Sequence, residues 1–392
     1  MSAAELFQRA LAAAPEGRLH FAAHSHHAWP DAAVEAHIAY AEQAIAQLDG
    51  KWGPIFGELW PRLQSRIASR LGLPDPSTLA FSPNTHDFLI RIVSCFEDAR
   101  TLRVLTTDAE FHSARRQLER WQESGRVELE VIPAEPHASF PERFQAAAAN
   151  GGHDLVVFSH VFFDSGYVVP DLQAIVDAVP DDDTWVLIDG YHAFNAIPVD
   201  LGSIAMRAFY LAGAYKYAMA GEGCCFLHAP PGFGPRPSVT GWFAGYADLE
   251  SSGGDREVRF ETDGTRFLGS TFDPVAMARL DASLGVLDAT GWTPQRIHAH
   301  VVALQSRFLA GLPTQGAPLS ADLLIPGPEV PERGHFLTFQ VGDAPGFHDR
   351  LAEAGVMTDH RKGRLRLGFA IYHDEAAVDA LLVRCRDLGL LG

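Results

Sequence analysis

Residues 184–192 read TWVLIDGYH, and residues 207–217 read RAFYLAGAYKY. Each segment is a short apolar run that ends in polar residues, with Asp189 closing the first run and Lys216 following the second. A nearly continuous apolar run of this length is typical of a strand buried on both faces of a parallel sheet. The two segments therefore predict consecutive strands whose ends carry chemically active side chains.

The same pattern extends over residues 77–230. Further apolar runs occur at residues 101–107, 127–134, 154–163 and 223–229. Amphipathic segments such as residues 112–123 lie between several of these runs. Alternation of this kind predicts an α/β fold with a mostly parallel sheet that helices cover on both faces. Ligands of such sheets bind beyond the carboxyl ends of the strands.

The pattern changes after residue 240. We expect two helices and two strands there, at residues 274–290, 293–310, 335–341 and 364–369. These elements predict a smaller α+β C-terminal domain. A chain of 392 residues is also longer than a single hydrophobic core usually supports. We predict a large domain over residues 16–262 and a small domain formed by residues 1–15 and 263–392.

The composition excludes several classes of protein. The formal net charge of −18 argues against a nucleic-acid surface, which needs clustered Lys and Arg. No apolar run is long enough to span a bilayer. The four cysteines, Cys95, Cys224, Cys225 and Cys385, match no zinc-site spacing and suit reduced thiols. We therefore expect a cytoplasmic protein with no membrane or nucleic-acid partner and no metal.

Lys216 stands between Tyr215 and Tyr217 at the end of an apolar run, where a solvated charge is unusual. A partly desolvated ammonium group has a lowered pKa, so its amine becomes nucleophilic and able to form a Schiff base. Pyridoxal 5'-phosphate (PLP) is the common carbonyl cofactor, and a carboxylate keeps its ring nitrogen protonated. Asp189, one strand away, suits that task. Each residue alone is more often structural, but the combination favours a PLP site.

Two other parts of such a site have candidates. Residues 82–86, SPNTH, open a helical stretch and offer a phosphate group the N-terminus of a helix. An ordinary helix cap is the alternative, and the two interpretations are compatible. Phe111 follows another strand and could stack on the cofactor ring. Its alternative is a place in the core.

Several motifs resemble one family. DGYH at 189–192, followed by GAYKYAMAGEG at 213–223, resembles the class V aminotransferase family of PLP-dependent enzymes, and within it kynureninase. Five further motifs occur in the family's order: EFHS (110–113), SHVFFDSG (159–166), TGWF (240–243), FLGST (267–271) and RLRLGFAIYH (364–373). The resemblance covers roughly residues 18–373 and implies the fold type I architecture of PLP enzymes.

The resemblance implies roles for individual residues. Lys216 would form the Schiff base and move the substrate's α-proton, Asp189 would pair with the ring nitrogen, and His192 would support both that carboxylate and the phosphate end. The cofactor-binding residues implied are Asn84, Thr85, His86, Phe111, Asp189, His192, Tyr215, Lys216, Trp242, Ser270 and Thr271. Ser270 or Thr271 would come from the second subunit of a homodimer with shared active sites. Arg366 would bind the α-carboxylate of an amino-acid substrate through its guanidinium fork.

The resemblance also implies an activity, hydrolytic Cβ–Cγ cleavage of a kynurenine-type amino acid. The alternatives are a class V aminotransferase or a β-lyase acting on another amino acid, and a non-catalytic binding protein of the same fold. A cysteine desulfurase needs a thiol on a mobile loop, whereas Cys385 lies in an expected helix and Cys224 and Cys225 lie in an apolar strand. The residues at substrate-facing positions differ from those of the family. For example, Phe162-Phe163 stands where related desulfurases have an Asn pair.

The segment HFAAHSHHAWP at residues 20–30 departs most, because HSHH stands where the family has Asn-Ser-Leu-Gly. A metal site is one interpretation, but two histidines on one face fall short of three protein ligands. A solvated or capping cluster is another. We predict that one or more of His24, Ser25, His26 and His27 line the substrate pocket, where a histidine can orient a carboxylate or shuttle a proton.

Overall fold

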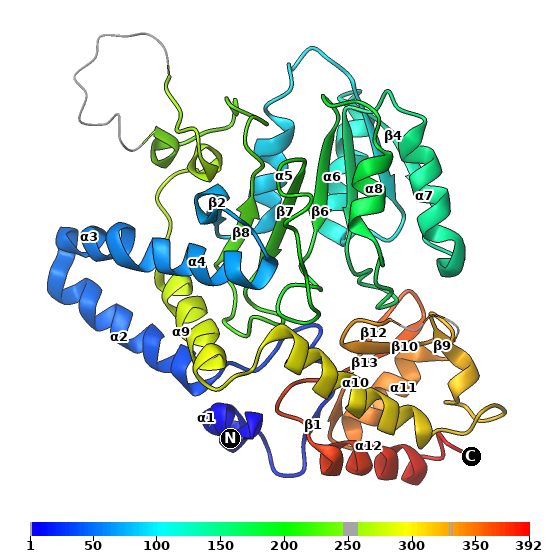
Figure 1. The fold of residues 1–392 in the computed structure, drawn as a ribbon. Helices are drawn as coiled ribbons and strands as arrows, with labels where there is room; N and C mark the ends of the chain where they lie inside the picture. The colour runs from blue at the N-terminus through cyan, green and yellow to red at the C-terminus, as the bar shows by residue number, and fades with distance from the viewer. Residues whose placement is uncertain (1, 246–257, 329, 331) are drawn as a thin grey trace.

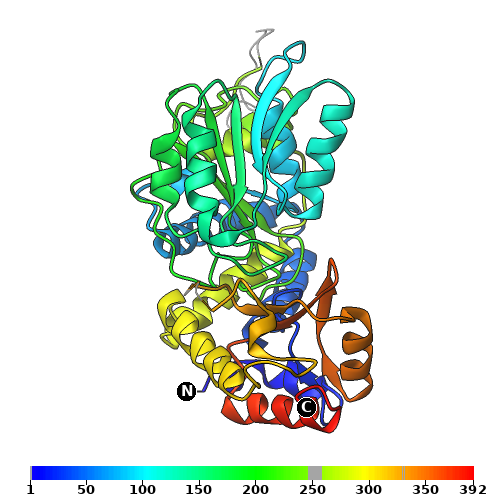
Figure 2. The same ribbon diagram turned by 90° about the vertical axis from the view of Figure 1, so that its right-hand side faces the viewer.

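The computed structural model describes residues 2–245, 258–328, 330 and 332–392. Figure 1 shows a large α/β part above a smaller part with its own sheet. The sheet of the large part has seven strands and that of the smaller part has four. Figure 2, turned by a quarter, shows the two parts stacked one above the other. The predicted α/β class and the mostly parallel sheet are confirmed.

The large sheet has the strand order β2-β8-β7-β6-β5-β3-β4. Its strands are β2 (Leu79–Ser82), β3 (Leu102–Thr107), β4 (Val127–Ile132), β5 (Leu155–Ser159), β6 (Trp185–Asp189), β7 (Ala208–Gly213) and β8 (Cys225–His228). The pairs among β3 to β7 are parallel, whereas β8 runs antiparallel to both β7 and β2. All six predicted strands of this region are present, and β7 and β5 are buried along their whole length.

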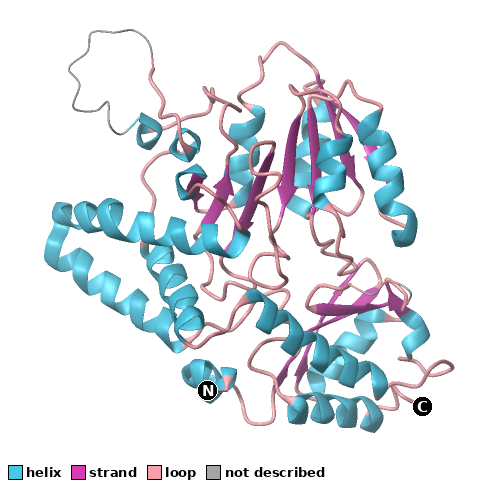
Figure 3. Ribbon diagram, viewed as in Figure 1, coloured by secondary structure: helices cyan, strands magenta, loops and turns pink. Residues whose placement is uncertain are grey.

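Helices cover both faces of this sheet (Figure 3). They are α5 (Thr85–Val93), α6 (His112–Glu123), α7 (Phe140–Ala149) and α8 (Leu172–Ala178). Helix α5 packs against β7 and β8, while α7 packs against α8. The apolar strands between the two helical layers form the largest hydrophobic core of the described chain. Such burial on both faces explains why these strands read as continuous apolar runs.

The chain begins with η1 (Ala3–Phe7) and α1 (Gln8–Ala13), and then forms helices that the sequence did not predict. These are α2 (Asp31–Gln47), η2 (Leu48–Lys51), α3 (Trp52–Pro54), the π-helical turn η3 (Ile55–Leu59) and α4 (Trp60–Leu71). Helices α2 and α4 both pack against α9 (Val275–Ala289), as Figure 1 shows. Among the described residues of α2 only Ala33 is buried, so this helix has no continuous apolar stripe to read from sequence.

The small sheet is antiparallel, with the order β12-β13-β10-β9. Its strands are β9 (Leu324–Ile325), β10 (Phe336–Phe339), β12 (Asp359–Arg361) and β13 (Arg364–Gly368), with helices α10 (Pro294–Ala310), α11 (Ala344–Glu353) and α12 (Glu375–Asp387). The short strand β1 (Leu19–His20) pairs in parallel with β11 (Val356–Met357). The segment after residue 20 therefore starts beside the small sheet. The predicted domain boundaries stay a prediction.

The turn between β12 and β13 reaches from the small part to the large part. Lys362 Nζ lies 2.8 Å from Asp164 Oδ2, and Arg364 forms an ion pair with Glu135. Lys362 adopts a positive φ of 49° at this turn. Both pairs have one half-exposed partner, the Lys362 side chain being 41% and the Glu135 side chain 52% exposed.

Gly190 is required by close packing behind β6. A Cβ atom at this position would lie 2.0 Å from the ring of Tyr210, which is fully buried. We expect Gly190→Ala to lower the free energy of unfolding by about 2 kcal/mol, because overpacked side chains force neighbours out of place. Urea unfolding followed by circular dichroism measures this. Gly57→Ala, which meets no atom within 4 Å, is the matched control and should not destabilise. Equal stability of the two variants would contradict the prediction.

Candidate active site

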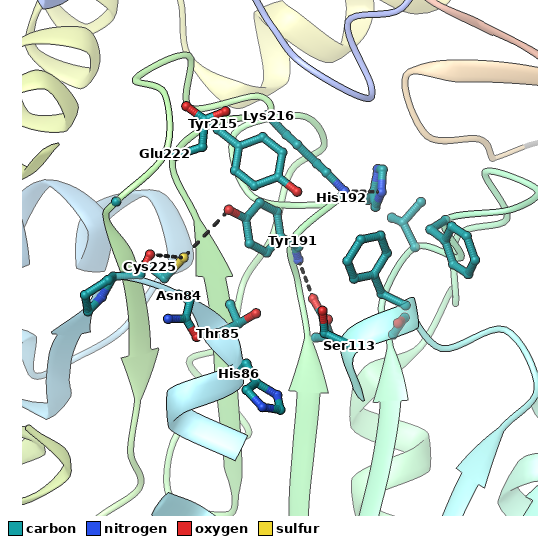
Figure 4. A pocket seen from close by; sticks show the side chains of 17 residues that line it. Asn84, Thr85, His86, Ser113, Tyr191, His192, Tyr215, Lys216, Glu222 and Cys225 are labelled. Atoms are coloured by element: carbon teal, nitrogen blue, oxygen red, sulfur yellow. Dashed lines mark hydrogen bonds between the residues drawn. The ribbon is translucent and has the colours of Figure 1, made fainter. Parts of the chain in front are cut away.

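A cavity of about 220 Å³, here called the central cavity, opens where β5, β6 and β7 end (Figure 4). Eight of the predicted site residues line it: Asn84, Thr85, His86, Phe111, Asp189, His192, Tyr215 and Lys216. They come from the N-terminus of α5, the end of β3 and the ends of two adjacent strands. The parallel register that pairs Asp189 with Leu211 brings the last two groups together.

Lys216 is buried at the centre of this group, 5% exposed. Its Nζ lies 2.6 Å from His192 Nε2 and 5.1 Å from the centre of the Phe111 ring. Burial lowers the pKa of Lys216 to about 7, and the nearby Asp189 carboxylate opposes part of that shift. An amine with this pKa is largely unprotonated above neutral pH, so it is available as a nucleophile.

Asp189 ends β6 with its carboxyl group toward the same cavity. Its Oδ1 accepts a hydrogen bond of 2.9 Å from the Tyr191 N–H. Burial raises the pKa of Asp189, while that N–H and the Lys216 charge lower it. A buried carboxylate of this kind is stabilised by a cation, whether Lys216 or a protonated ring nitrogen.

His192 is buried beside Lys216, and burial followed by the Lys216 charge lowers its pKa well below the usual value. It is therefore a neutral imidazole at physiological pH. Its Nδ1 atom is buried without a hydrogen-bond partner in the described part of the chain. Because a neutral ring has one donor and one acceptor nitrogen, His192 Nε2 can share a hydrogen bond with the Lys216 amine in either direction.

The N-terminus of α5 forms another wall of the cavity. Asn84 caps the helix, since its Oδ1 accepts a 2.9 Å hydrogen bond from the Asp87 N–H. The first N–H groups of a helix have no partner within the helix and favour anions. Thr85 and Tyr215 add hydroxyl groups that line the same space (Figure 4). These residues offer donors that suit a phosphate group.

Three of the predicted cofactor-binding residues do not line the central cavity: Trp242, Ser270 and Thr271. Trp242 is 42% exposed, and its Nε1 donates a 2.9 Å hydrogen bond to Thr271 Oγ1. They therefore lie outside the cavity of their own chain.

Arg366, on β13, is 4% exposed and lies next to the central cavity without lining it. It forms an ion pair with Asp359 and donates a hydrogen bond to the carbonyl oxygen of Phe163, whose side chain does line the cavity. Its Nε atom is buried with no partner among the described residues. One edge of the guanidinium is thus held by the protein, and a donor remains for a ligand.

His24 lies against the ion pair of Arg366 with Asp359. It is 1% exposed, its ring stacks on Phe336 at 4.8 Å, and its Nε2 is 3.7 Å from Asp359 Oδ2. Burial, followed by the charge of Arg366, lowers the pKa of His24 to about 3, so the ring is neutral. Gly368 leaves room for it, since a Cβ there would lie 2.2 Å from His24 Nδ1.

The other members of the cluster, Ser25, His26 and His27, have different surroundings. His26 stacks on Tyr215 at 5.4 Å, with its Nε2 3.5 Å from a carboxylate oxygen of Glu222, which lines the central cavity. Ser25 Oγ lies 3.2 Å from His26 Nδ1. A separate cavity of about 440 Å³ near the N-terminus is lined by His27 and also by His26. The structure thus places His24, Ser25 and His26 beside the site, while His27 lines the second cavity and touches the site only through its N–H, which lies 3.4 Å from the Tyr215 carbonyl oxygen.

Several lining residues were given no role from the sequence: Ser113, Ser159, Val161, Tyr191 and Glu222. Ser159 ends β5 opposite Asp189, so the rule that identified Asp189 would have found it. No sequence signal marks Asp359, which lies at the site only through pairing of β12 with β13.

The described residues contain no cluster of three or more His, Cys, Asp or Glu side chains that could hold a metal ion. None of the described helices is both long and apolar enough to cross a membrane.

All four cysteines are free. Cys225 lines the central cavity, but burial raises the pKa of its thiol to about 12. Burial likewise raises the pKa of Cys385 to about 12, and that residue is fully buried in α12. A reactive thiol needs the opposite environment, one that favours the thiolate. None of these cysteines is suited to act as a nucleophile.

The sequence matches no protein-family model and no curated protein. Solved structures resemble the chain over nearly its whole length. The cystine C-S lyase C-DES, in complex with its reaction product cysteine persulfide, has 18% identity and a TM-score of 0.79, covering 95% of this chain and 98% of that one. The apo cysteine desulfurase of Thermococcus onnurineus NA1 has 17% identity and a TM-score of 0.76, covering 95% and 94%. The cysteine desulfurase CsdA of Escherichia coli has 15% identity and a TM-score of 0.75, covering 96% of each chain.

Identities this low show the fold alone. The chain has the fold of these enzymes, the fold type I architecture, as predicted. Another structure with this fold is a lysine mutant of C-DES with glycine covalently linked to its PLP cofactor.

Proposed function

We propose that the chain is a PLP-dependent enzyme that acts on an amino acid. The observation that carries this proposal is the buried Lys216 amine, held between His192 and Phe111 beside the Asp189 carboxylate. The residues fit the cofactor, since an orphaned buried His192 nitrogen, a buried carboxylate and the donors of the α5 N-terminus face one cavity. Bound PLP would supply a Schiff base to Lys216 and an electron sink.

The chain's own residues then have distinct tasks. Lys216 attaches the cofactor and afterwards carries a proton to or from the substrate's α-carbon. Asp189 holds the proton on the ring nitrogen, and Thr85, Tyr215 and the α5 N-terminus bind the phosphate. The purified protein should be yellow and should lose its visible absorption band on treatment with borohydride. A colourless protein that takes up no PLP contradicts the proposal and would favour a non-catalytic binding protein.

Arg366 is proposed to bind the substrate's α-carboxylate. We expect Arg366→Gln to raise KM about 100-fold, because a charged hydrogen-bonded pair contributes about 1.5–3 kcal/mol. Arg366→Lys should recover little of this, since an ammonium group lacks the guanidinium fork. Steady-state kinetics measures both variants.

The matched control is the double variant Arg366→Gln with Asp359→Asn, which also removes the carboxylate that pairs with Arg366. Its KM should stay as high as that of Arg366→Gln. A KM restored to the wild-type value would mean that Asp359, rather than the loss of Arg366, caused the effect.

For the reaction, we propose kynureninase-like hydrolytic cleavage of the Cβ–Cγ bond. The motifs DGYH and GAYKY support it, as does the burial of all cysteines near the site, which removes the thiol that a desulfurase requires. Incubation with L-kynurenine or 3-hydroxykynurenine should release alanine and the corresponding anthranilate. If neither product forms with the PLP-loaded protein, this reaction is wrong.

A β-lyase or an aminotransferase is the second candidate, and the likeness to the cystine C-S lyase favours it. A β-lyase given cystine would release pyruvate, ammonia and cysteine persulfide. An aminotransferase would pass the amino group of an amino acid to pyruvate or 2-oxoglutarate. The same protein preparation can be tested for all three outcomes.

We further propose a cytoplasmic homodimer in which the partner completes each site. The position of Trp242, Ser270 and Thr271 outside their own chain's cavity supports the shared site. The four free cysteines support a reducing compartment. Co-expressing Lys216→Ala chains with Thr271→Ala chains should yield hybrid dimers that regain activity at one site. A strict monomer in sedimentation experiments would exclude the shared site.

A further inference from the structure

A second buried carboxyl group, that of Glu110, lies behind the central cavity. Glu110 is 1% exposed and follows β3 in the chain. Its Oε1 accepts hydrogen bonds from Thr107 Oγ1 at 2.7 Å and from the Ser159 N–H at 3.1 Å. Its Oε2 lies 2.7 Å from Ser159 Oγ. None of the tasks proposed above uses this group.

Glu110 and Asp189 line the same small cavity of about 30 Å³. A space of about 10–15 Å³ by this measure holds one water molecule if polar partners surround it. His86 lines this cavity too, and its Nδ1 is buried with no partner among the residues described. The two carboxyl groups can therefore interact directly through space or through one bridging water.

The charges around Glu110 make two simultaneous carboxylates costly. Burial, the largest cause, and the Asp189 charge together raise the pKa of Glu110 to about 7. The hydrogen bonds from Thr107 on β3 and Ser159 on β5 act in the opposite direction. His86, from α5, is the other titratable side chain at the small cavity. Two buried carboxyl groups that interact in this way titrate as a pair.

We propose that Glu110 is a positioning residue that holds a proton beside Asp189, so that the pair carries one negative charge and this charge lies on Asp189. The inference rests on the proposed function, since Asp189 is the carboxylate that faces the cofactor's ring nitrogen. A protonated Glu110 donates from Oε2 to Ser159 Oγ. The Ser159 hydroxyl hydrogen is then free to point into the central cavity, which Ser159 lines.

Infrared spectroscopy of the cofactor-free protein tests the proton directly. Wild type should show the C=O stretch of a buried protonated carboxylic acid, which disappears as the pH rises through about 7. Glu110→Gln, which preserves the shape of the side chain, should lack this band. Glu119→Gln, on the exposed face of α6, is the matched control and should keep it. A wild-type protein without the band at pH 6, or a band unchanged in Glu110→Gln, overturns the proposal.

Asp189→Asn provides a second test in a chain that keeps Glu110. Removing the Asp189 charge should move the midpoint of the band about one pH unit lower, because a neighbouring like charge raises a carboxyl pKa by this order. An unchanged midpoint overturns the coupling even if Glu110→Gln fails to fold. Because both measurements use cofactor-free protein, a failure to bind PLP would contradict the proposed function and leave this test intact.

In the PLP-loaded protein, the visible spectrum should change with a midpoint near pH 7, and Glu110→Gln should remove that transition. A purely structural Glu110 would alter stability but leave the midpoint in place, and that outcome also overturns the proposal.

Discussion

Lys216→Ala is expected to abolish covalent cofactor attachment and to lower kcat by about 1,000-fold or more. The variant removes both the nucleophile and the group that moves the substrate's proton, and each task alone is worth orders of magnitude in rate. The variant replaces the buried side chain with a methyl group and so removes the amine from its 2.6 Å contact with His192.

Covalent attachment can be located as well as detected. The chain has only three lysines, Lys51, Lys216 and Lys362. Borohydride reduction of the PLP-loaded protein, followed by mass spectrometry of peptides, should find the modification on Lys216 alone. Lys362→Ala is the matched control and should keep both the modification and most of the activity. Modification of Lys51 or Lys362 in wild type, with Lys216 unmodified, would contradict the assignment.

The rate of attachment should depend on pH. Only the unprotonated amine attacks the aldehyde, and burial places the pKa of Lys216 at about 7. Covalent uptake of PLP by the cofactor-free protein should therefore accelerate as the pH rises and level off above about pH 7. Stopped-flow absorbance measures the rate.

Asp189→Asn is expected to lower kcat by about 100- to 5,000-fold while leaving the fold intact. Breaking a buried charge pair costs about 3–5 kcal/mol, and each 1.36 kcal/mol of barrier is tenfold in rate. The Asn side chain can still accept the hydrogen bond from the Tyr191 N–H, so the geometry of the turn is kept. The loss therefore reports the charge.

A chemical rescue separates this effect from damage to the site. PLP methylated at the ring nitrogen is permanently cationic there, and should restore part of the kcat of Asp189→Asn. Asp164→Asn, which removes the carboxylate paired with Lys362 at the edge of the site, is the matched control and should change kcat less than tenfold. Wild-type kcat in Asp189→Asn would show that this carboxylate is not the partner of the ring nitrogen.

The large sheet could be predicted from sequence because its strands are buried on both faces. An apolar run such as residues 207–213 can be predicted as a strand from its own sequence alone. The residues that follow it are then candidates for the binding site. The small sheet was harder to predict, since strands of two or three residues, such as β9 and β12, are too short to show a hydrophobic period. Helix α2 was missed for a related reason, because its exposed residues show no apolar stripe.

Some residues of the candidate site could likewise be predicted from sequence, whereas others could not. Asp189 and Lys216 were identified from their positions at strand ends, and the cavity contains both. The contacts of Arg366 with Asp359 and of His24 with Phe336 join segments that only tertiary packing brings together. Glu110 stands in a motif that the sequence supplied, but its buried contacts with Ser159 depend on strand order.

The β12–β13 turn has a consequence for how substrate enters. Lys362 lies 5.8 Å from the centre of the Phe163 ring, so this ion pair stands at the edge of the central cavity. Ion pairs with exposed partners contribute about 0–1 kcal/mol each and weaken as salt screens them. The contacts that the Lys362 and Arg364 pairs make between the small part and the large part therefore cost little free energy to break. Ionic strength should act on the association and release rates of substrate while leaving the buried chemistry of Lys216 and Asp189 unchanged.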